Sequence, residues 1–487
     1  MAVYKRFPLF VAVIAFLAVF TGCGGGGNSL SFPPPQGSFT NASLTGPFAF
    51  SYTGSDGRGF LAVAGSFQAD GAGHVTSGMQ DINSGFGIFT NSLISGTYAV
   101  RADGRGSVTL NSPAGNSVID FVIVSGGHAL ITRFDANASG SGTIDQQTTS
   151  AFSNAALAGS FAFNLSGIDG VNNPLAVAGN FTSDATGNIS SGIDDSNDSG
   201  SVITNDPLTG AVPVSSNGRG AATVNTVRGT LTFAFYVVDA NHLKLVEVDN
   251  SPVLGGEAFR QTGPFSNASV SGPFAFTLAG ADIAVGGPFA AGGILVSNGA
   301  GSVTSGTEDL NDAGSVTTNI ALTGSYSVAA NGRGTLSLVN GLQTFNFAIY
   351  PSSGGVLALE TDVRFVTTGT GLQQQSAPFN AAAFSGTYGL NFTGATSSGG
   401  ELDSIAEFTA DGASKVTGII DLNNNGGITF GQPLSGSFSV IANGRTPLTL
   451  QTPLGTQNIV MYMVNSNRAL FIERDPNLVA AGDIRHQ

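Results

Sequence analysis

A fifteen-residue segment that occurs four times constrains the fold of this chain more than any other feature. The four copies span residues 96–110 (GTYAVRADGRGSVTL), 210–224 (GAVPVSSNGRGAATV), 324–338 (GSYSVAANGRGTLSL) and 436–450 (GSFSVIANGRTPLTL). Their central arginines are Arg105, Arg219, Arg333 and Arg445, spaced 114, 114 and 112 residues apart. The chain of 487 residues therefore repeats one unit of about 113 residues four times.

The repeated segment has the pattern of a β-hairpin. In the first copy Tyr98 and Val100 alternate with smaller residues, which is the period of a strand with one buried face. An Asp-Gly or Asn-Gly pair follows in every copy, and such pairs tolerate the positive φ of a tight type I′ turn. For the arginine after each turn, we expect either a solvated side chain or an ion pair with a carboxylate on a neighbouring strand.

The rest of each repeat consists of further alternating segments. The first repeat opens with a glycine followed by Phe48, Phe50 and Tyr52 on one face, and the other copies keep this pattern. About eight strands fit into each repeat, and no helical periodicity follows residue 37. The sequence predicts an all-β chain of four tandem antiparallel meanders, each closed into a small up-and-down barrel without exposed edges. A two-sheet β-sandwich is the alternative.

The repeats also set the expected domain boundaries. These are a signal peptide at 1–22, a Gly/Pro-rich tether at 23–37, and repeats at 38–147, 152–261, 265–374 and 379–487. The linkers between repeats are only three or four residues long. Such short linkers predict a semi-rigid rod of domains.

The N-terminus has the features of an export signal. Lys5 and Arg6 precede an apolar run at 7–20, which suits a signal peptide and is short for a membrane span. The run ends before Thr-Gly-Cys23, which resembles the lipobox of bacterial lipoproteins, although Phe20 stands where that family prefers leucine. The alternative is an ordinary secretory signal with an incidental cysteine.

The lipobox resemblance implies a location. It implies that Cys23 becomes the lipidated N-terminus of an exported protein, anchored to the bacterial outer membrane or cell surface. Gly24 agrees with the outer membrane, since lipoproteins retained at the inner membrane carry aspartate there. Cys23 is the only cysteine, so no disulfide forms within the chain, and packed β-structure must provide the stability.

Composition narrows the possible partners. The net charge is −14, only three lysines occur, and no basic patch is present, which argues against nucleic acid. Charged residues make up 10% of the chain, so Ser, Thr, Asn and Gly must cover its surface. Such a surface suits glycans or the surfaces of other proteins.

The most regular polar motif is Asp-x-Asn, which occurs once in each repeat. With the second aspartates of repeats two and three, it comprises Asp81, Asn83, Asp195, Asn197, Asp198, Asp309, Asn311, Asp312, Asp421 and Asn423. Alternating oxygen-bearing side chains near a glycine turn suit Ca²⁺, although the spacing is not that of an EF-hand. Calcium is thus the one candidate cofactor. The alternative is a set of Asx turns between strands.

Two further patterns contain residue types that can take part in catalysis or metal binding. Glu-x-Asp occurs in repeats two to four, as in Glu247 and Asp249, and we expect a structural role for it beside the repeat arginine. His128 and His242 occupy matching positions without counterparts in repeats three and four, and we expect them at exposed strand ends. No nucleophile, zinc or phosphate-loop motif is present, so the sequence predicts no enzyme.

The glycine–aromatic strand starts also resemble calycin barrels such as lipocalins and avidins, without the tryptophan of their first strand. That resemblance implies a carrier of small apolar ligands. About eight phenylalanines per repeat favour a filled interior instead. The leading hypothesis is therefore a non-enzymatic surface lipoprotein acting as a spacer, adhesion or carbohydrate-binding array. A single outer-membrane barrel is a third possibility, which the uniformly short linkers disfavour.

Overall fold

The computed structural model describes residues 38–375, 377–396 and 399–487. The expected signal peptide and tether, with Cys23, lie outside the described residues. Within them, helix is confined to single turns at the openings of the repeats. These are 3₁₀ turns at Asn41–Ser43, Thr149–Ala151, Asn267–Ser269 and Ala381–Ala383, and the α-helical turn α1 (Asn154–Leu157). No helix in this part of the chain is long and apolar enough to cross a bilayer.

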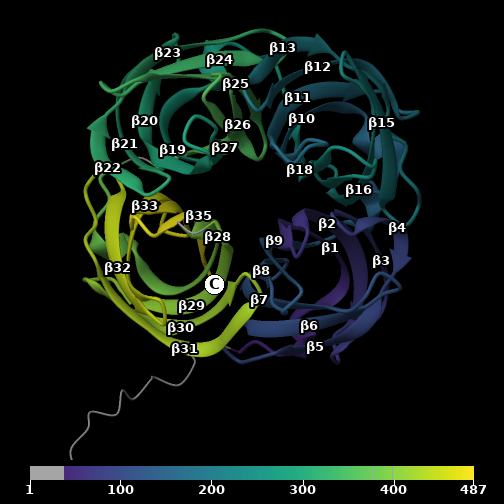
Figure 1. Cartoon of the computed structure of the whole chain (residues 1–487), viewed down its shortest axis with the longest axis horizontal. Coiled ribbons are helices and arrows are strands. Elements are labelled where there is room, and N and C mark those ends of the chain that lie inside the picture. Colours follow the sequence, from purple (N-terminus) through teal and green to yellow (C-terminus); the bar gives the residue numbers. More distant parts are fainter. Residues whose placement is uncertain (1–37, 376, 397–398) are drawn as a thin grey trace, which may run out of the picture. The chain divides into compact units, whose positions relative to one another are not determined.

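The first repeat folds into a closed antiparallel barrel (Figure 1). Its strands are β1 (Thr45–Asp56), β2 (Gly59–Asp70), β3 (His74–Ser84), β4 (Gly87–Leu93), β5 (Ser95–Val100), β6 (Arg105–Asn111), β7 (Ser117–Ser125), β8 (His128–Arg133) and β9 (Ala138–Gln146). Strand β1 pairs with both β2 and β9, which closes the sheet. Strands β4 and β5 both pair with β3, so together they occupy one of the eight strand positions.

The other repeats form the same barrel. The second comprises β10 (Gly159–Ile168), β11 (Pro174–Ser183), β12 (Asn188–Asp198), β13 (Ser201–Pro207), β14 (Thr209–Ala211), β15 (Arg219–Thr226), β16 (Gly229–Asp239), β17 (His242–Glu247) and β18 (Val253–Gln261). The third comprises β19 (Ser271–Asp282), β20 (Gly287–Asn298), β21 (Ser302–Asp312), β22 (Ser315–Ala321), β23 (Thr323–Val328), β24 (Gly334–Val339), β25 (Thr344–Ser352), β26 (Gly355–Glu360) and β27 (Phe365–Gln373). The fourth comprises β28 (Ser385–Thr396), β29 (Glu401–Asp411), β30 (Lys415–Asn424), β31 (Gly427–Phe438), β32 (Arg445–Thr452), β33 (Gly455–Asn465), β34 (Arg468–Glu473) and β35 (Leu478–His486). The prediction of four eight-stranded barrels is confirmed, and the sandwich alternative is wrong.

The repeated segment forms the expected hairpin, but with a different turn. Tyr98 faces Val108 across the β5–β6 pair, and both side chains are buried. Only the glycine of the Asp-Gly pair has a positive φ, +83° at Gly104, and its amide donates to the carbonyl of Arg101. A type I′ turn needs two positive φ angles, so this is a four-residue turn ended by a left-handed glycine.

Aromatic side chains fill the barrel interiors. In the second barrel Phe161 is 0% exposed and stacks on Phe181, with ring centroids 5.7 Å apart. The cavities inside the second and third barrels measure about 40 and 50 Å³. That space is comparable to one or two water molecules. The interiors of these two barrels are therefore cores and leave no room for an organic ligand.

We predict that Phe161→Ala lowers the free energy of unfolding by about 3–5 kcal/mol, because it leaves a cavity in a closed core. Urea unfolding followed by circular dichroism measures this loss. Phe86→Ala is the matched control, since Phe86 is 56% exposed, and we expect a change within about 0.5 kcal/mol. Equal losses for the two variants would contradict the assignment of Phe161 to the core.

Candidate functional site

The Asp-x-Asn motif joins each barrel to the next. The side-chain amide of Asn197 on β12 donates to the backbone carbonyls of Glu360, Asp362 and Phe365 in the third barrel, at 3.1, 2.8 and 2.9 Å. Asn83, Asn311 and Asn423 make equivalent contacts with the second, fourth and first barrels. The backbone of the Glu-x-Asp segment is thus the receptor for this asparagine, which corrects our placement of that segment beside the repeat arginine.

The aspartate of the same motif pairs with the repeat arginine of the next barrel. Arg333 Nε and Nη2 donate to the two carboxylate oxygens of Asp195 at 2.8 and 2.6 Å, and the Tyr350 hydroxyl donates to the same group. Arg219 with Tyr236 holds Asp81 in this way, and Arg445 with Tyr462 holds Asp309. Burial and the neighbouring Asp195 raise the pKa of Tyr350 well above its usual value, so the hydroxyl keeps its proton. The expected ion pair is present in these three joints, but the carboxylate belongs to another barrel.

These contacts do not fit a calcium site. Both oxygens of Asp195 are engaged, since Oδ1 also accepts from the backbone amide of Asn205 at 2.8 Å. The additional aspartates point to other partners: Asp198 interacts with Asp169, and Asp312 pairs with Arg364 at 2.9 Å. Within the described residues, no group of three or more His, Cys, Asp and Glu side chains is placed to hold a metal.

A glutamine at the end of each repeat completes the joint. Gln261 Nε2 donates to the carbonyls of Gly332 and Pro351 in the third barrel, at 3.1 and 2.9 Å. Gln487 of the fourth barrel donates in the same way to Asp103 and Ile123 of the first barrel, at 2.8 and 2.9 Å. The contacts therefore run from each barrel to the next and return to the first. A linear rod, in which the first and fourth barrels do not touch, is wrong.

We predict strong coupling within the arginine joint. Arg333→Ala leaves the fully buried Asp195 carboxylate without its cation, which costs about 3–5 kcal/mol of stability. Removing both partners in Arg333→Ala/Asp195→Ala costs less than the sum of the single changes. Calorimetric unfolding of the four proteins gives the coupling energy. Additive losses would show that the two side chains act independently.

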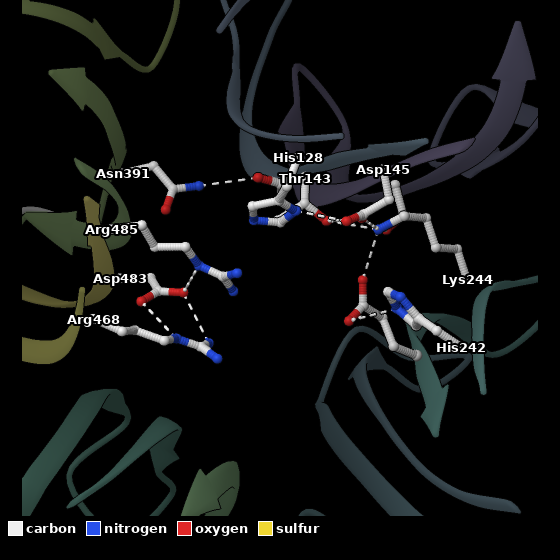
Figure 2. A network of polar contacts seen from close by, with 12 residues as sticks. His128, Thr143, Asp145, His242, Lys244, Asn391, Arg468, Asp483 and Arg485 are labelled. Carbon is white, nitrogen blue, oxygen red and sulfur yellow. Dashed lines mark hydrogen bonds and ion pairs between the residues drawn. The ribbon is translucent and has the colours of Figure 1, made fainter. Parts of the chain in front are cut away.

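A cavity of about 580 Å³ lies where the four barrels meet. It is lined by β1, β8 and β9 of the first barrel and by the corresponding strands of the other three. Figure 2 shows a charged network beside this cavity, whose labelled residues come from the first, second and fourth barrels. The third barrel contributes uncharged residues, among them Thr368, Thr370 and Leu372.

One half of this charged network is centred on Lys244. This side chain is 0% exposed, and its Nζ contacts Asp145 at 2.8 Å, Glu257 at 2.9 Å and Thr143 at 2.6 Å. Burial by itself lowers the Lys244 pKa, but the two carboxylates outweigh it and raise the pKa. His128 Nδ1 lies 2.5 Å from Asp145, and His242 Nε2 lies 3.3 Å from Glu257. The two carboxylates therefore share one lysine, and each also contacts a histidine.

The other half consists of two arginines that share one carboxylate. Arg468 contacts Asp483 through Nε at 3.1 Å and Nη2 at 2.9 Å, and Arg485 contacts it through Nε at 2.7 Å (Figure 2). The terminal nitrogens of Arg485 donate to no residue in the described part of the chain. This wall thus carries a net positive charge and has unused hydrogen-bond donors.

The repeats differ from one another at the cavity, although all four keep the asparagine and glutamine contacts of the joints. The position two residues before the terminal glutamine holds Asp145, Phe259, Leu372 or Arg485. The two histidines begin strands β8 and β17, as expected, but their side chains line the cavity and are only 15% and 17% exposed, so the expected exposure is wrong. No local motif in the sequence indicates the other charged residues of this network, which are Asp145, Lys244, Glu257, Arg468, Asp483 and Arg485. Aligning the four repeats position by position does reveal some of them, because Asp145 and Arg485 carry charges where the other repeats have Phe259 and Leu372.

Comparisons with known proteins do not assign a family. No family model matches the chain, and no curated protein matches it. Among solved structures, it is similar to a protein of unknown function from the DUF3598 family of Nostoc punctiforme. The identity is 9%, the match covers 91% of this chain and 97% of the other, and the TM-score is 0.15. A likeness at that score supports no conclusion about fold or function.

Proposed function

We propose that this chain is a non-enzymatic bacterial surface lipoprotein that binds a small polar ligand, of the carbohydrate class, in the central cavity. The cavity is the observation that carries the proposal. Its volume of about 580 Å³ lies within the usual range for small-molecule sites. It combines threonine and asparagine side chains with guanidinium groups, which suit hydroxyl and carboxylate groups of a sugar.

The charge distribution favours an acidic ligand. The carboxylates of the first and second barrels are already paired with Lys244, whereas the terminal nitrogens of Arg485 have no partner among the described residues. A carboxylate of the ligand would accept hydrogen bonds from Arg485 and from the unused Nη1 of Arg468. An acidic sugar, such as a uronic acid, satisfies both this wall and the polar remainder of the cavity.

The arrangement favours one site per chain. In a repeat array with independent sites, each barrel would carry the same ligand-binding residues. Here each barrel contributes a different set to one shared cavity, while the barrel interiors are filled. These observations disfavour the alternative function, a calycin-like carrier of apolar ligands. They also narrow the hypothesis of a carbohydrate-binding array to a single composite site.

The same pairing argues against a carboxylate acting as general base at this site. Such a carboxylate needs a free lone pair close to the substrate. Both oxygens of Asp145 are engaged, by His128 and by Lys244, and Asp483 is shared by two arginines. A binding role uses the remaining free donors and requires no such base.

We expect Arg468→Ala/Arg485→Ala to lose binding of uronic-acid oligosaccharides by at least about tenfold, since two charge-assisted hydrogen bonds are removed. Isothermal titration calorimetry with acidic and neutral oligosaccharides measures affinity and stoichiometry. Arg58→Ala is the control, because Arg58 stacks on Phe86 away from the cavity. A stoichiometry of four, or unchanged affinity in the double variant, would contradict a single central site.

The proposed lipid anchor at Cys23 can be tested independently of the ligand site. We expect radiolabelled palmitate to be incorporated into the wild-type protein in bacteria and to be absent from Cys23→Ala, because lipidation requires the thiol. The variant should also leave the membrane fraction. Persistent labelling of Cys23→Ala would contradict the lipoprotein assignment without affecting the proposed ligand site.

A further inference from the structure

The joint between the fourth and first barrels differs from the other three. These two barrels are not consecutive in the chain, so no linker spans their joint. Val122 stands where the other joints have a tyrosine. Arg105 lies 3.5 Å from Asp421 and pairs more closely with Asp103 of its own barrel, at 3.0 Å. The bidentate contact of the other joints is therefore reduced to one long contact.

The apolar part of this joint is also the smallest. Four buried residues form it: Val122, Val124, Leu130 and Ile405. The corresponding clusters of the other joints contain seven, eight and ten buried residues in the described part of the chain. Since hydrophobic stabilisation grows with buried apolar area, this joint receives the least of it.

Buried carboxylates occupy places that are apolar in the other joints. Asp403 stands where the other repeats have Ala62, Ala176 and Ala290, and Asp120 stands where they have Ala234, Ala348 and Val460. Asp403 is 0% exposed and accepts hydrogen bonds from the hydroxyls of Ser139 and Ser141 in the first barrel. No cation lies within ion-pair distance of Asp403 or Asp120 among the described residues.

The ionisable groups of this joint are unbalanced. Around its buried carboxylates they are Glu401, Asp403, Glu407 and Asp421 of the fourth barrel, and Arg101, Asp103, Arg105, Asp120, Arg133 and Asp135 of the first. At its cavity end, His128 and Asp145 of the first barrel face Asp483 and Arg485 of the fourth, and burial lowers the pKa of His128. Burial raises the pKa of Asp403 to about 6. Burial likewise raises the pKa of Glu407 and that of Asp120 to about 7. Burial and the neighbouring Asp403 raise the pKa of Glu401 well above its usual value.

These shifts fix the direction of the pH effect. When the joint opens, the carboxylates enter water, where an aspartate titrates near its ordinary value of 3.8. The closed joint therefore holds protons that the open joint releases. Protonation of these carboxylates stabilises the closed joint fully below about pH 4. This stabilisation is lost as the pH rises through 6 to 7.

We propose that the joint between the fourth and first barrels is a pH-dependent gate, closed in acid and opening as the pH rises above neutrality. Opening moves the Arg468–Arg485 wall away from the His128–Asp145 wall, so it takes the central cavity apart. The effect on ligand binding rests on the proposed function. The opening itself depends only on the joint.

Thiol labelling measures this opening in the full chain without ligand. In a Cys23→Ser background, Val124→Cys places a thiol in the joint, and Phe86→Cys places one on an exposed loop of the same barrel. The ratio of their maleimide labelling rates cancels the common pH dependence of thiols and reports the open fraction. Asp403 alone should raise this ratio about tenfold between pH 5 and pH 8.

Two variants make the test specific. Asp120→Ala/Asp403→Ala restores alanines found in other repeats and should abolish most of the increase, whereas Asp184→Ala removes an exposed carboxylate and should leave it unchanged. A ratio independent of pH in the wild-type chain, or an unchanged increase in the double variant, would overturn the proposal. If labelling changes with pH but no oligosaccharide binds, the gate stands and the proposed function fails.

A third variant rebuilds the stronger joint. Tyr462 packs on Gly292, where a Cβ would lie 2.5 Å from the ring, but Val122 packs on the larger Ile405. Val122→Tyr/Ile405→Ala should supply the missing tyrosine together with the space that it needs. We expect a lower labelling ratio at pH 8 than in the parent chain. An equal or higher ratio would argue against the tyrosine as the cause of the difference between joints.

Discussion

The structure of this chain depends on one contact, the asparagine amide that each barrel inserts into the backbone of the next. A buried amide without partners costs about 1–3 kcal/mol, so it strongly favours the one arrangement of two barrels that offers it three carbonyls. The adjacent Asp–Arg–Tyr group adds a charged contact with narrow geometry. Because the fourth barrel makes the asparagine contact with the first, the four equivalent asparagine contacts form a closed cycle.

The residues that stabilise the barrels and their joints differ from the residues that line the shared cavity. The joints use an asparagine, an aspartate, an arginine and a glutamine that recur in every repeat, and the barrel cores use recurring phenylalanines. At positions that face the shared cavity the repeats diverge, for example at Asp145, Phe259, Leu372 and Arg485. A scaffold of nearly equivalent units can therefore surround a site with no internal symmetry, with two arginines on one wall and paired carboxylates on another.

The joint between the fourth and first barrels has the weakest arginine contact and the smallest apolar cluster of the four. Hydrogen bonds from Ser139 and Ser141 to Asp403 stand where the other joints have packed alanines. Arg105 contacts both Asp103 of its own barrel and Asp421 of the fourth barrel. Burying carboxylates without a paired cation is costly unless they take up protons. Because its buried carboxylates take up protons, this joint depends on pH.

Sequence periodicity determined the number of repeats, the strand pattern and the aromatic cores, because these follow from neighbours along the chain. Alternation around Phe48 or Tyr98 reports which face of a strand is buried, and an Asp-Gly pair reports a turn, although not its type. Only the tertiary structure decided what the polar motifs contact. Arg333 binds Asp195, which lies 138 residues earlier in the chain, and local residue spacing carries no information about so distant a partner. For the same reason the Asp-x-Asn motif resembled a calcium loop, and His128 resembled an exposed strand end, until the placement of one barrel against the next gave each side chain its neighbours.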